Sequence, residues 1–417
     1  MSAETPVDDK GRTRVAITGL GVKSPAGSTV DGFWAQILAA EATAAAEVRR
    51  FDAGDLPVHF ACEVRDFDPT EYFSAKEARR ADRFTQLGFG AAADARRDAG
   101  DPLADPARCA TVVGTGVGGI ETLTDQLDVL RDKGPTRVSP FLVPMMMANA
   151  NAGVIAMELG WTGPSMCIAT ACAAGTHAIG EGARLVRDGT ADLVLAGGAE
   201  AAITPITLSA FHRMGALSTF DDPTRASRPF DARRDGFVIG EGAAFLVLEP
   251  LGRALERGAD VYAEVTGYAR TSDAYHITAP PPGGEGAAAC MQGALDDAGI
   301  DPGAIGHVNA HGTSTPLNDA AEASAIRKVF AISPPVTSIK GVTGHLIGAA
   351  GAVEAVASVL ALRDELVPPT ANVERVGDDI ELDVVVGQAR DVARAPVISN
   401  SFGFGGHNAS LVIAPVS

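Results

Sequence analysis

The sequence contains an internal repeat. Ala110–Leu123 resembles His307–Ala320, and both read as a strand, a glycine-rich turn and the start of a helix. In the same order, Ser165–Val186 resembles Thr337–Leu360, each a strand that runs into a helix of small residues. Recurrence of one strand-helix unit is typical of folds that stack related units. We therefore predict two similar halves that pack as one body.

The halves are expected to meet near residue 255, which divides the chain into 1–255 and 256–417. The first half is longer, and we assign the excess to an insertion around Gln126–Asn151. A chain of 417 residues has room for roughly two or three hydrophobic cores.

Short β-branched runs recur along the chain, each bounded by glycine and followed by an alanine-rich helical stretch. The runs are Val15–Gly19, Ala110–Gly114, Met166–Thr170, Leu193–Gly197, Ala263–Gly267, Gly306–Ala310, Val336–Ile339 and Val397–Asn400. This alternation predicts an α/β fold with largely buried strands. The helices expected over Ala173–Arg187 and Ala349–Arg363 carry small residues on every side, which favours burial between layers.

Composition narrows the functional classes. The chain is 46% hydrophobic and 21% charged, so it can bury a large core and is not intrinsically disordered. Its 34 basic and 52 acidic residues give a net charge of −18, which argues against nucleic-acid binding by bulk electrostatics. An acidic partner must therefore meet a local basic patch.

The cysteines indicate a reducing compartment. They are five in number, and they lack the CxxC spacing of a zinc site or the even count of a disulfide framework. The polar N-terminus does not resemble a secretion signal, and no apolar run reaches the roughly 18 residues of a membrane span. We expect a soluble cytoplasmic protein that binds neither membrane nor nucleic acid.

The stretch Gly114–Gly119 reads GTGVGG and matches a dinucleotide-binding fingerprint. That fingerprint also needs an acidic residue at the end of a second strand about 20 residues later. Here the following acids, Glu121, Asp125 and Asp128, lie in a helical pattern. We therefore interpret the glycines as allowing close backbone approach to a ligand without phosphate.

Cys172 lies where a strand gives way to a helix of small residues, in IATACAAGTHAIG. A helix N-terminus favours thiolate over thiol, and the neighbouring alanines leave room for a substrate. Cysteine is also a small apolar residue that fills cores. The core interpretation is kept for Cys62, Cys109, Cys167 and Cys290.

Two histidines favour the chemical interpretation of Cys172. His311 and His345 each occupy a strand-to-helix turn of the second half, and His345 and Cys172 fall at equivalent places in the repeat. If the halves pack around a pseudo-twofold axis, the three side chains converge on one cleft. The remaining histidines have no such placement: His177, His212, His276, His307 and His407.

Zinc accepts this set of ligands. We discount a metal site because no close-spaced ligand pair preorganises the ion and because Lys340, five residues before His345, repels a dication. Lys340 stands at a strand end in an apolar context, and Glu354 on the next helix is placed to neutralise it.

The segment Asn400–Asn408, NSFGFGGHN, has two phenylalanines among glycines. It can move an aromatic ring and present backbone N–H groups to an oxyanion. It also reads as a glycine-rich hairpin between two final strands.

Together these motifs resemble the β-ketoacyl-acyl carrier protein synthases of the thiolase superfamily, most closely the elongating ketosynthase II type. The resemblance covers almost the whole chain and rests on VAITGLGVKSPAG, TACAAG, AGGAE, RPFDARRDGFVIGEGA, SDAYHITAP, VNAHGTSTPLND, KGVTGHLIGAAG and NSFGFGGHN. It implies a five-layer αβαβα fold of duplicated halves and a homodimer. It also implies Cys172 as the acylated nucleophile, His311 and His345 as the catalytic histidines, and Lys340 and Glu354 as their supporting network. Phe404 looks like the gating phenylalanine whose N–H completes the oxyanion hole.

The resemblance further implies an acyl pocket. Val117 and Leu142 stand where larger residues are common, so the channel is expected to be wider or longer. Phe402, Thr313 and Thr315 are also expected to bind substrate. His407 stands where the family usually has a threonine, and the sequence does not indicate what this replacement changes.

The implied reaction is decarboxylative condensation of a malonyl thioester with the acyl group on Cys172. It needs no cofactor, because phosphopantetheine arrives on the acyl carrier protein. A degradative thiolase is disfavoured because the last cysteine is Cys290, and a chain-length factor is disfavoured by Cys172 itself. Fatty-acid elongation and the catalytic subunit of a type II polyketide synthase both remain open.

Carrier protein is acidic and needs a cationic landing site. Lys76, Arg79, Arg80 and Arg83 are spaced as one helical face. Arg131, Lys133 and Arg213 are expected to extend that face. Such a run of charge is also common on solvated helices.

Overall fold

The computed structural model describes residues 6–416, which form two sets of strands with one shared topology. The first set is β1 (Val15–Lys23), β4 (Cys109–Gly114), β5 (Ser165–Ile168), β6 (Leu193–Glu200) and β7 (Gly242–Pro250). The second is β8 (Ala263–Ser272), β9 (His307–Asn309), β10 (Pro335–Thr337), β14 (Val397–Gly403) and β15 (His407–Ala414), with β12 (Asp383–Val384) added at its edge.

The two sets have the same strand order and the same strand directions. The first runs β1-β7-β6-β4-β5 and the second β8-β15-β14-β9-β10. In each set the first two pairings are antiparallel and the next two are parallel. The predicted repeat is therefore confirmed, with β4 equivalent to β9 and β5 to β10. A short antiparallel pairing of β1 with β8 joins both sets into one hydrogen-bonded sheet.

Three large apolar cores separate the two strand sets from the helices on either face, which gives five layers. Leu193 and Leu195 of β6 face the core under α3 (Arg83–Asp98), whereas Val194 and Ala196 face the opposite core. That alternation follows from the two-residue period of a strand. The outer face of the second set packs on α10 (Glu285–Ala298) and α11 (Pro316–Val329).

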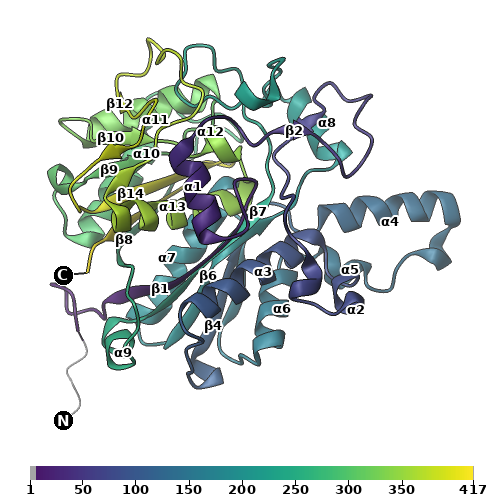
Figure 1. The fold of residues 1–417 in the computed structure, drawn as a ribbon, viewed down its shortest axis with the longest axis horizontal. Helices are drawn as coiled ribbons and strands as arrows, with labels where there is room; N and C mark the ends of the chain where they lie inside the picture. The colour runs from purple at the N-terminus through teal and green to yellow at the C-terminus, as the bar shows by residue number, and fades with distance from the viewer. Residues whose placement is uncertain (1–5, 417) are drawn as a thin grey trace.

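The middle layer consists of α7 (Ala174–Arg187) and α13 (Ala350–Asp364), which pack on each other between the two sets (Figure 1). Every residue of α13 from Ala350 to Leu362 is buried. A Cβ on Gly175 would lie 2.8 Å from the backbone nitrogen of Ala352, so the helices approach closely only because that residue is glycine. The expected burial of these two helices is confirmed, and the molecule has the predicted αβαβα layering.

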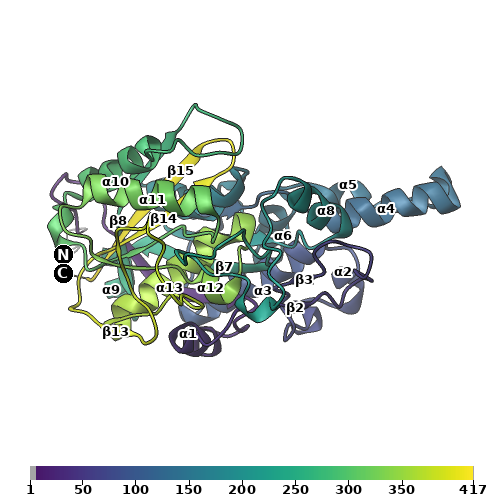
Figure 2. The ribbon, with the colours of Figure 1, turned by 90° about the horizontal axis from the view of Figure 1, so that it is seen from above.

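The expected insertion around Gln126–Asn151 falls on α4 (Ile120–Lys133) and α5 (Leu142–Met146), whereas α6 (Ala150–Leu159) packs on α3, β4 and β5. Helix α4 projects from the body in both views (Figures 1 and 2). The remaining helices are α1 (Val30–Ala39), α2 (Ala75–Ala78), α8 (Pro205–Arg213), α9 (Leu251–Glu256) and α12 (Lys340–Thr343), and the remaining strands are β2 (Ala46–Glu47), β3 (Phe60–Ala61), β11 (Leu366–Val367) and β13 (Arg390–Asp391). Within residues 6–416, no helix has the length and apolarity to cross a membrane.

Candidate active site

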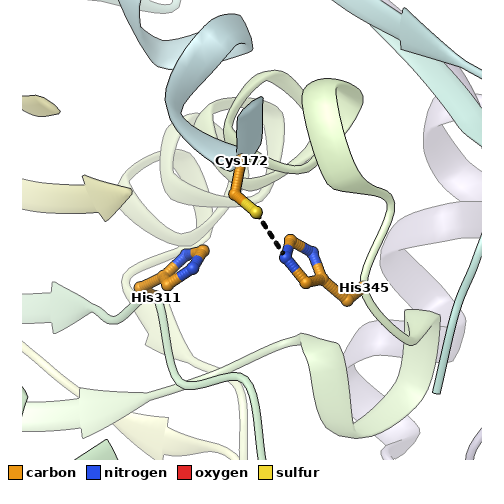
Figure 3. Close-up of side chains that lie close together, drawn as sticks. All are labelled: Cys172, His311 and His345. Carbon is orange, nitrogen blue, oxygen red and sulfur yellow. Dashed lines mark hydrogen bonds between the residues drawn. The ribbon is translucent and has the colours of Figure 1, made fainter. Parts of the chain in front are cut away.

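Three side chains from three separate turns meet in one buried cluster (Figure 3). Cys172 lies in a one-turn helix between β5 and α7, His311 follows β9, and His345 follows α12. The Nε2 atom of His345 lies 3.0 Å from the Sγ atom of Cys172. The two imidazole centroids are 5.3 Å apart with the rings nearly perpendicular. The predicted convergence is therefore confirmed.

The expected equivalence of His345 and Cys172 is wrong. The turn before α7 contains Ala171 at φ 49°, and the matching turn before α13 contains Ile347 at φ 47°. Cys172 thus corresponds to Gly348, the residue after Ile347. His345 precedes that turn because α12 is inserted between β10 and α13. The two halves therefore place their reactive side chains at different positions of the repeated strand-helix unit.

Hydrogen bonds select the tautomer of each imidazole. The Nδ1 atom of His345 accepts from the backbone N–H of Ile347 at 3.3 Å. The Nδ1 atom of His311 lies 3.3 Å from Nζ of Lys340, an ammonium that can only donate. Each ring therefore carries its proton on Nε2. The site offers two N–H donors beside the sulfur.

Lys340 and Glu354 form the expected buried pair. Lys340 also donates to the carbonyl oxygen of His311 at 2.5 Å. Burial, and then the Lys340 charge, holds the pKa values of His311 and His345 well below the usual 6.5. Both rings are therefore neutral near pH 7.

The expected thiolate at Cys172 is wrong for the buried site. Burial raises the pKa of Cys172 to about 11, and this desolvation outweighs the lowering by Lys340 and by backbone N–H donors. The sulfur therefore keeps its proton near neutral pH. Nucleophilic attack must be coupled to loss of that proton.

Two backbone N–H groups converge on the sulfur. The N–H groups of Phe404 and Cys172 both lower the pKa of the Cys172 thiol, because they lie close enough to stabilise negative charge on Sγ. Phe404 begins the turn between β14 and β15, which Gly405 and Gly406 complete at φ 84° and 73°. The segment is therefore both the expected hairpin and a source of donors at the position where an oxyanion next to sulfur would form.

A cavity of about 600 Å³ opens beside this cluster. Four of the five residues expected to bind substrate line it: Val117, Phe402, Thr313 and Thr315. Leu142 is the exception, and its contact with substrate stays a prediction. It begins α5, which packs on α4 and α6 in the insertion, outside the lining of the cavity.

The GTGVGG turn also lines the cavity, through Gly116 and Val117. Its backbone N–H groups are already occupied, because Gly116 and Val117 donate to the carboxylate of Glu200 at 2.6 and 3.3 Å. A phosphate bound at this turn would compete with a buried carboxylate. The turn therefore does not serve as a dinucleotide site.

Sequence analysis did not single out several residues that shape the site. Glu322 accepts from the backbone N–H groups of His311 and Gly312 at 2.8 and 2.7 Å. The ring of Phe237 packs edge-on against His345, with centroids 5.3 Å apart. His276 lines the cavity although it was set aside with the other histidines. Glu322 stands among small residues in AAEASA, and this is the sequence signal that could have pointed to it.

His407 lies outside that cavity, in a second depression of about 440 Å³ with His177 and Arg270. Nothing in the structure explains its replacement of threonine.

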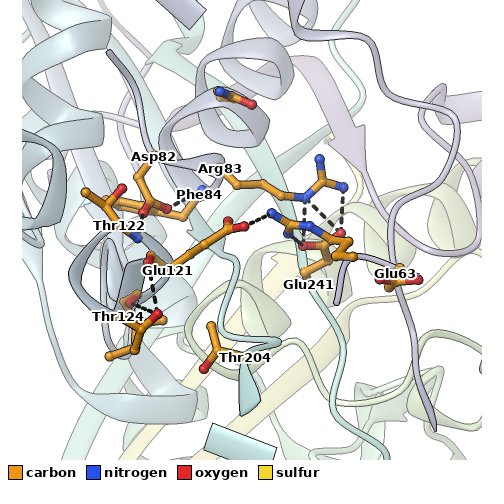
Figure 4. A network of polar contacts seen from close by, with 12 residues as sticks. Glu63, Asp82, Arg83, Phe84, Glu121, Thr122, Thr124, Thr204 and Glu241 are labelled. Atoms are coloured by element: carbon orange, nitrogen blue, oxygen red, sulfur yellow. Dashed lines mark hydrogen bonds and ion pairs between the residues drawn. The ribbon is translucent and has the colours of Figure 1, made fainter. Parts of the chain in front are cut away.

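The expected docking residues do not form one helical face. Helix α2 ends at Ala78 and α3 begins at Arg83, with Asp82 capping it. Arg83 points inward, where it binds the buried Glu241 at 2.6 Å (Figure 4). It is therefore unavailable to a partner. The guanidinium of Arg80 lies over the Phe141 ring at 4.2 Å.

The other expected docking residues are exposed but dispersed. Lys76 and Arg79 lie on and after α2, and Arg131 and Lys133 lie toward the projecting end of α4. Arg213 ends α8, next to Met214, which lines the cavity. Of these residues, only Arg213 lies at the mouth of the cavity, because it is next to Met214 in the chain.

A metal is geometrically possible at the cluster. The sulfur of Cys172 and the ring nitrogens of His311 and His345 lie within 4.8 Å of one another. The Lys340 ammonium at His311 opposes a dication there.

Comparison with known proteins identifies one family over most of the chain. Residues 12–254 match the model of the β-ketoacyl synthase N-terminal domain, and residues 262–374 match that of its C-terminal domain. The chain is 47% identical over 408 residues to the 3-oxoacyl-[acyl-carrier-protein] synthase 2 of Synechocystis sp., covering 96% of this chain and 97% of that protein. It is 44% identical over 411 residues to the protein of the same name from Coxiella burnetii, covering 97% and 99%.

Solved structures agree in fold. The ishigamide ketosynthase/chain length factor superposes with a TM-score of 0.91 at 37% identity, covering 97% of this chain and 100% of that one. A β-ketoacyl synthase from Burkholderia phymatum gives 0.90 at 33% identity with the same coverage. A type II polyketide ketosynthase in complex with its acyl carrier protein gives 0.87 at 31% identity, again with the same coverage.

Proposed function

Because this chain belongs to the β-ketoacyl synthase family and is a β-ketoacyl-acyl carrier protein synthase of fatty acid elongation, we propose that Cys172 carries the growing acyl chain. The observation that carries the proposal is the 3.0 Å contact of its sulfur with His345 in a cluster that also holds His311. The relatives named 3-oxoacyl-[acyl-carrier-protein] synthase 2 are 44–47% identical, against 31% for the polyketide ketosynthase, which supports elongation of fatty acyl chains.

Acyl transfer to Cys172 begins with attack of Sγ on the thioester carbonyl of the acyl carrier protein. The N–H groups of Cys172 and Phe404 hold the resulting oxyanion. The bond to the phosphopantetheine sulfur then breaks. The leaving thiolate takes up the proton that Cys172 loses, so the transfer is balanced.

Malonyl thioester next enters the cavity. Its carbonyl oxygen accepts from the Nε2–H groups of His311 and His345, whose Nδ1 atoms are held by Lys340 and Ile347. Loss of carbon dioxide leaves the electron pair as an enolate that these donors stabilise. The enolate carbon attacks the acyl carbonyl on Cys172, a carbon–carbon bond forms, and the sulfur leaves and is reprotonated. Thiol and imidazole N–H groups supply the chemistry, and no resident cofactor takes part.

The partner we propose is acyl carrier protein, which delivers both thioesters. With a net charge of −18, this chain repels an acidic carrier except where basic residues are exposed. Lys76, Arg79, Arg80 and Arg213 are the proposed contacts, and of these Arg213 lies next to Met214 in the lining of the cavity.

We propose that the chain works as a homodimer in the cytoplasm. Among the described residues, β5 pairs on one side only, with β4. Exposed apolar side chains lie on β5 itself (Met166), on α6 (Met157), and on α4 and α5 of the insertion (Leu127, Leu130 and Val143). A second copy fits this face, because an open edge strand and an apolar patch both favour burial. Sedimentation of Met157→Glu should show a monomer, and an unchanged mass would refute this interface. The free cysteines support the proposed location in the cytoplasm, which is a reducing compartment.

Intact-mass analysis tests the proposed function. Incubation with acyl carrier thioesters should add one acyl group to the wild-type chain and none to Cys172→Ala. Cys290→Ala is the matched control, because Cys290 is an equally buried free cysteine away from the cavity. Acylation that persists in Cys172→Ala would overturn the assignment.

A further inference from the structure

Glu200 is a fully buried carboxylate that the reaction does not use. It ends β6, and its side chain is surrounded by donors from two loops. Oε2 accepts from the N–H groups of Gly116 at 2.6 Å and Gly348 at 3.1 Å. Oε1 accepts from the hydroxyl of Thr115 at 3.1 Å and the N–H of Val117 at 3.3 Å.

These donors belong to two loops, one from each half of the chain, that meet at the cavity. Gly116 and Val117 lie in the turn after β4 of the first half, and Ile347, next to Gly348, lies in the turn before α13 of the second. Gly116 and Gly348 are in contact, since a Cβ on Gly348 would lie 2.2 Å from the Gly116 nitrogen. The Glu200 side chain therefore links the two loops by hydrogen bonds at the place where they are in contact.

The Glu200 carboxylate is held by uncharged donors. Among the described residues, its hydrogen bonds come from backbone N–H groups and one hydroxyl, and no ion pair joins it to lysine or arginine. Burial raises the pKa of Glu200 to about 7, and the N–H donors act against this rise. Burying a carboxylate without a cation lowers the stability of the folded protein. We therefore expect its hydrogen bonds to hold the two loops in place.

We propose that Glu200 is a positioning residue for acyl-chain selection, fixing the adjoining loops that carry Val117 and Ile347 in the lining of the cavity so that these side chains set the length of chain accepted. This rests on the proposed function, because it assumes that the cavity holds the acyl group on Cys172. Glu200 acts through the loops and does not touch the reacting atoms.

The test is the acyl-chain profile of Glu200→Gln. An amide keeps the volume but replaces one acceptor oxygen by an N–H₂ group, which faces N–H donors. Acylation of Cys172 is measured by intact mass with carrier thioesters of 4 to about 18 carbons, and malonyl decarboxylation is measured on the same samples. We expect the ratio of long-chain to short-chain acylation to change about tenfold, the scale of losing hydrogen bonds to a charged group, while decarboxylation changes much less.

The controls separate positioning from general damage. Glu249→Gln removes another buried carboxylate on the same sheet, bound to Arg257, and should leave the chain-length ratio unchanged. Thr115→Val removes a single donor and should shift the ratio in the same direction by less, so it decides the outcome if Glu200→Gln does not fold. An equal loss of every acylation and of decarboxylation, or an unchanged ratio, overturns the proposal. Failure of the wild-type chain to acylate would instead refute the proposed function.

Discussion

The Nζ atom of Lys340 lies 3.3 Å from Nδ1 of His311 and 2.5 Å from its carbonyl oxygen. This one side chain holds the ring, selects the tautomer with the proton on Nε2, and keeps the ring neutral through its charge. Because Glu354 neutralises Lys340, the arrangement places a cation beside a histidine without leaving an unpaired buried charge.

Lys340→Met removes that donor at similar length. We expect malonyl decarboxylation to fall by about 100-fold, since a misoriented donor loses transition-state stabilisation of this size, with a smaller effect on acylation of Cys172. Release of carbon dioxide and intact mass measure the two steps separately. Lys23→Met is the matched control, because Lys23 is a buried lysine paired with Asp94 elsewhere. Equal loss of both steps in Lys340→Met would mean that the lysine supports only the fold.

Separation of the two half-reactions is expected in Cys172→Gln. Without a nucleophile no acyl group is bound, but the N–H donors of His311 and His345 remain, so malonyl thioester should still lose carbon dioxide. Adding His311→Ala should lower that rate by about 100-fold or more. Decarboxylation that is unaffected by the second change would contradict the assigned role of His311.

The pH dependence of the free energy of unfolding should show the contribution of the buried His307. Burial lowers the pKa of His307 to about 3. A group whose pKa falls on folding contributes stability above its unfolded pKa of about 6.5, and loses it as the pH decreases. The free energy of unfolding of the wild-type chain should therefore fall, relative to His307→Gln, by about 1.4 kcal/mol per pH unit below pH 6.5. Urea titrations at several pH values measure this difference, and parallel curves would refute it.

Carrier recognition should depend on the exposed basic residues around α2. Reversal of Lys76, Arg79 and Arg80 to glutamate should raise the KM for acyl carrier substrates about tenfold, with kcat little changed, because rim charges act mainly on encounter. Arg83 is left intact because it holds Glu241 inside the protein.

The matched control for this charge reversal is a triple reversal on the second half, at Arg327, Lys328 and Arg375, which are also exposed. It changes the net charge equally. If both triple variants raise the KM alike, the effect is one of total charge and not of docking.

The sequence by itself determined the duplicated α/β architecture and the identity of the reactive groups. The repeat is visible because each half must bury the same strand and helix faces, so the small residues of α7 and α13 recur with the same period. Cys172, His311 and His345 stand out because they interrupt glycine-rich and alanine-rich turns where few other side chains can react.

Only the tertiary structure decided how those groups behave. The charge state of Cys172 depends on burial by neighbours distant in sequence, which local helix geometry does not predict. The inward turn of Arg83, the carboxylates of Glu200 and Glu322 beneath the loops, and the position of Leu142 outside the cavity all follow from contacts between segments far apart in the chain. Local sequence specifies which elements form, whereas desolvation and pairing of charge depend on what packs against them.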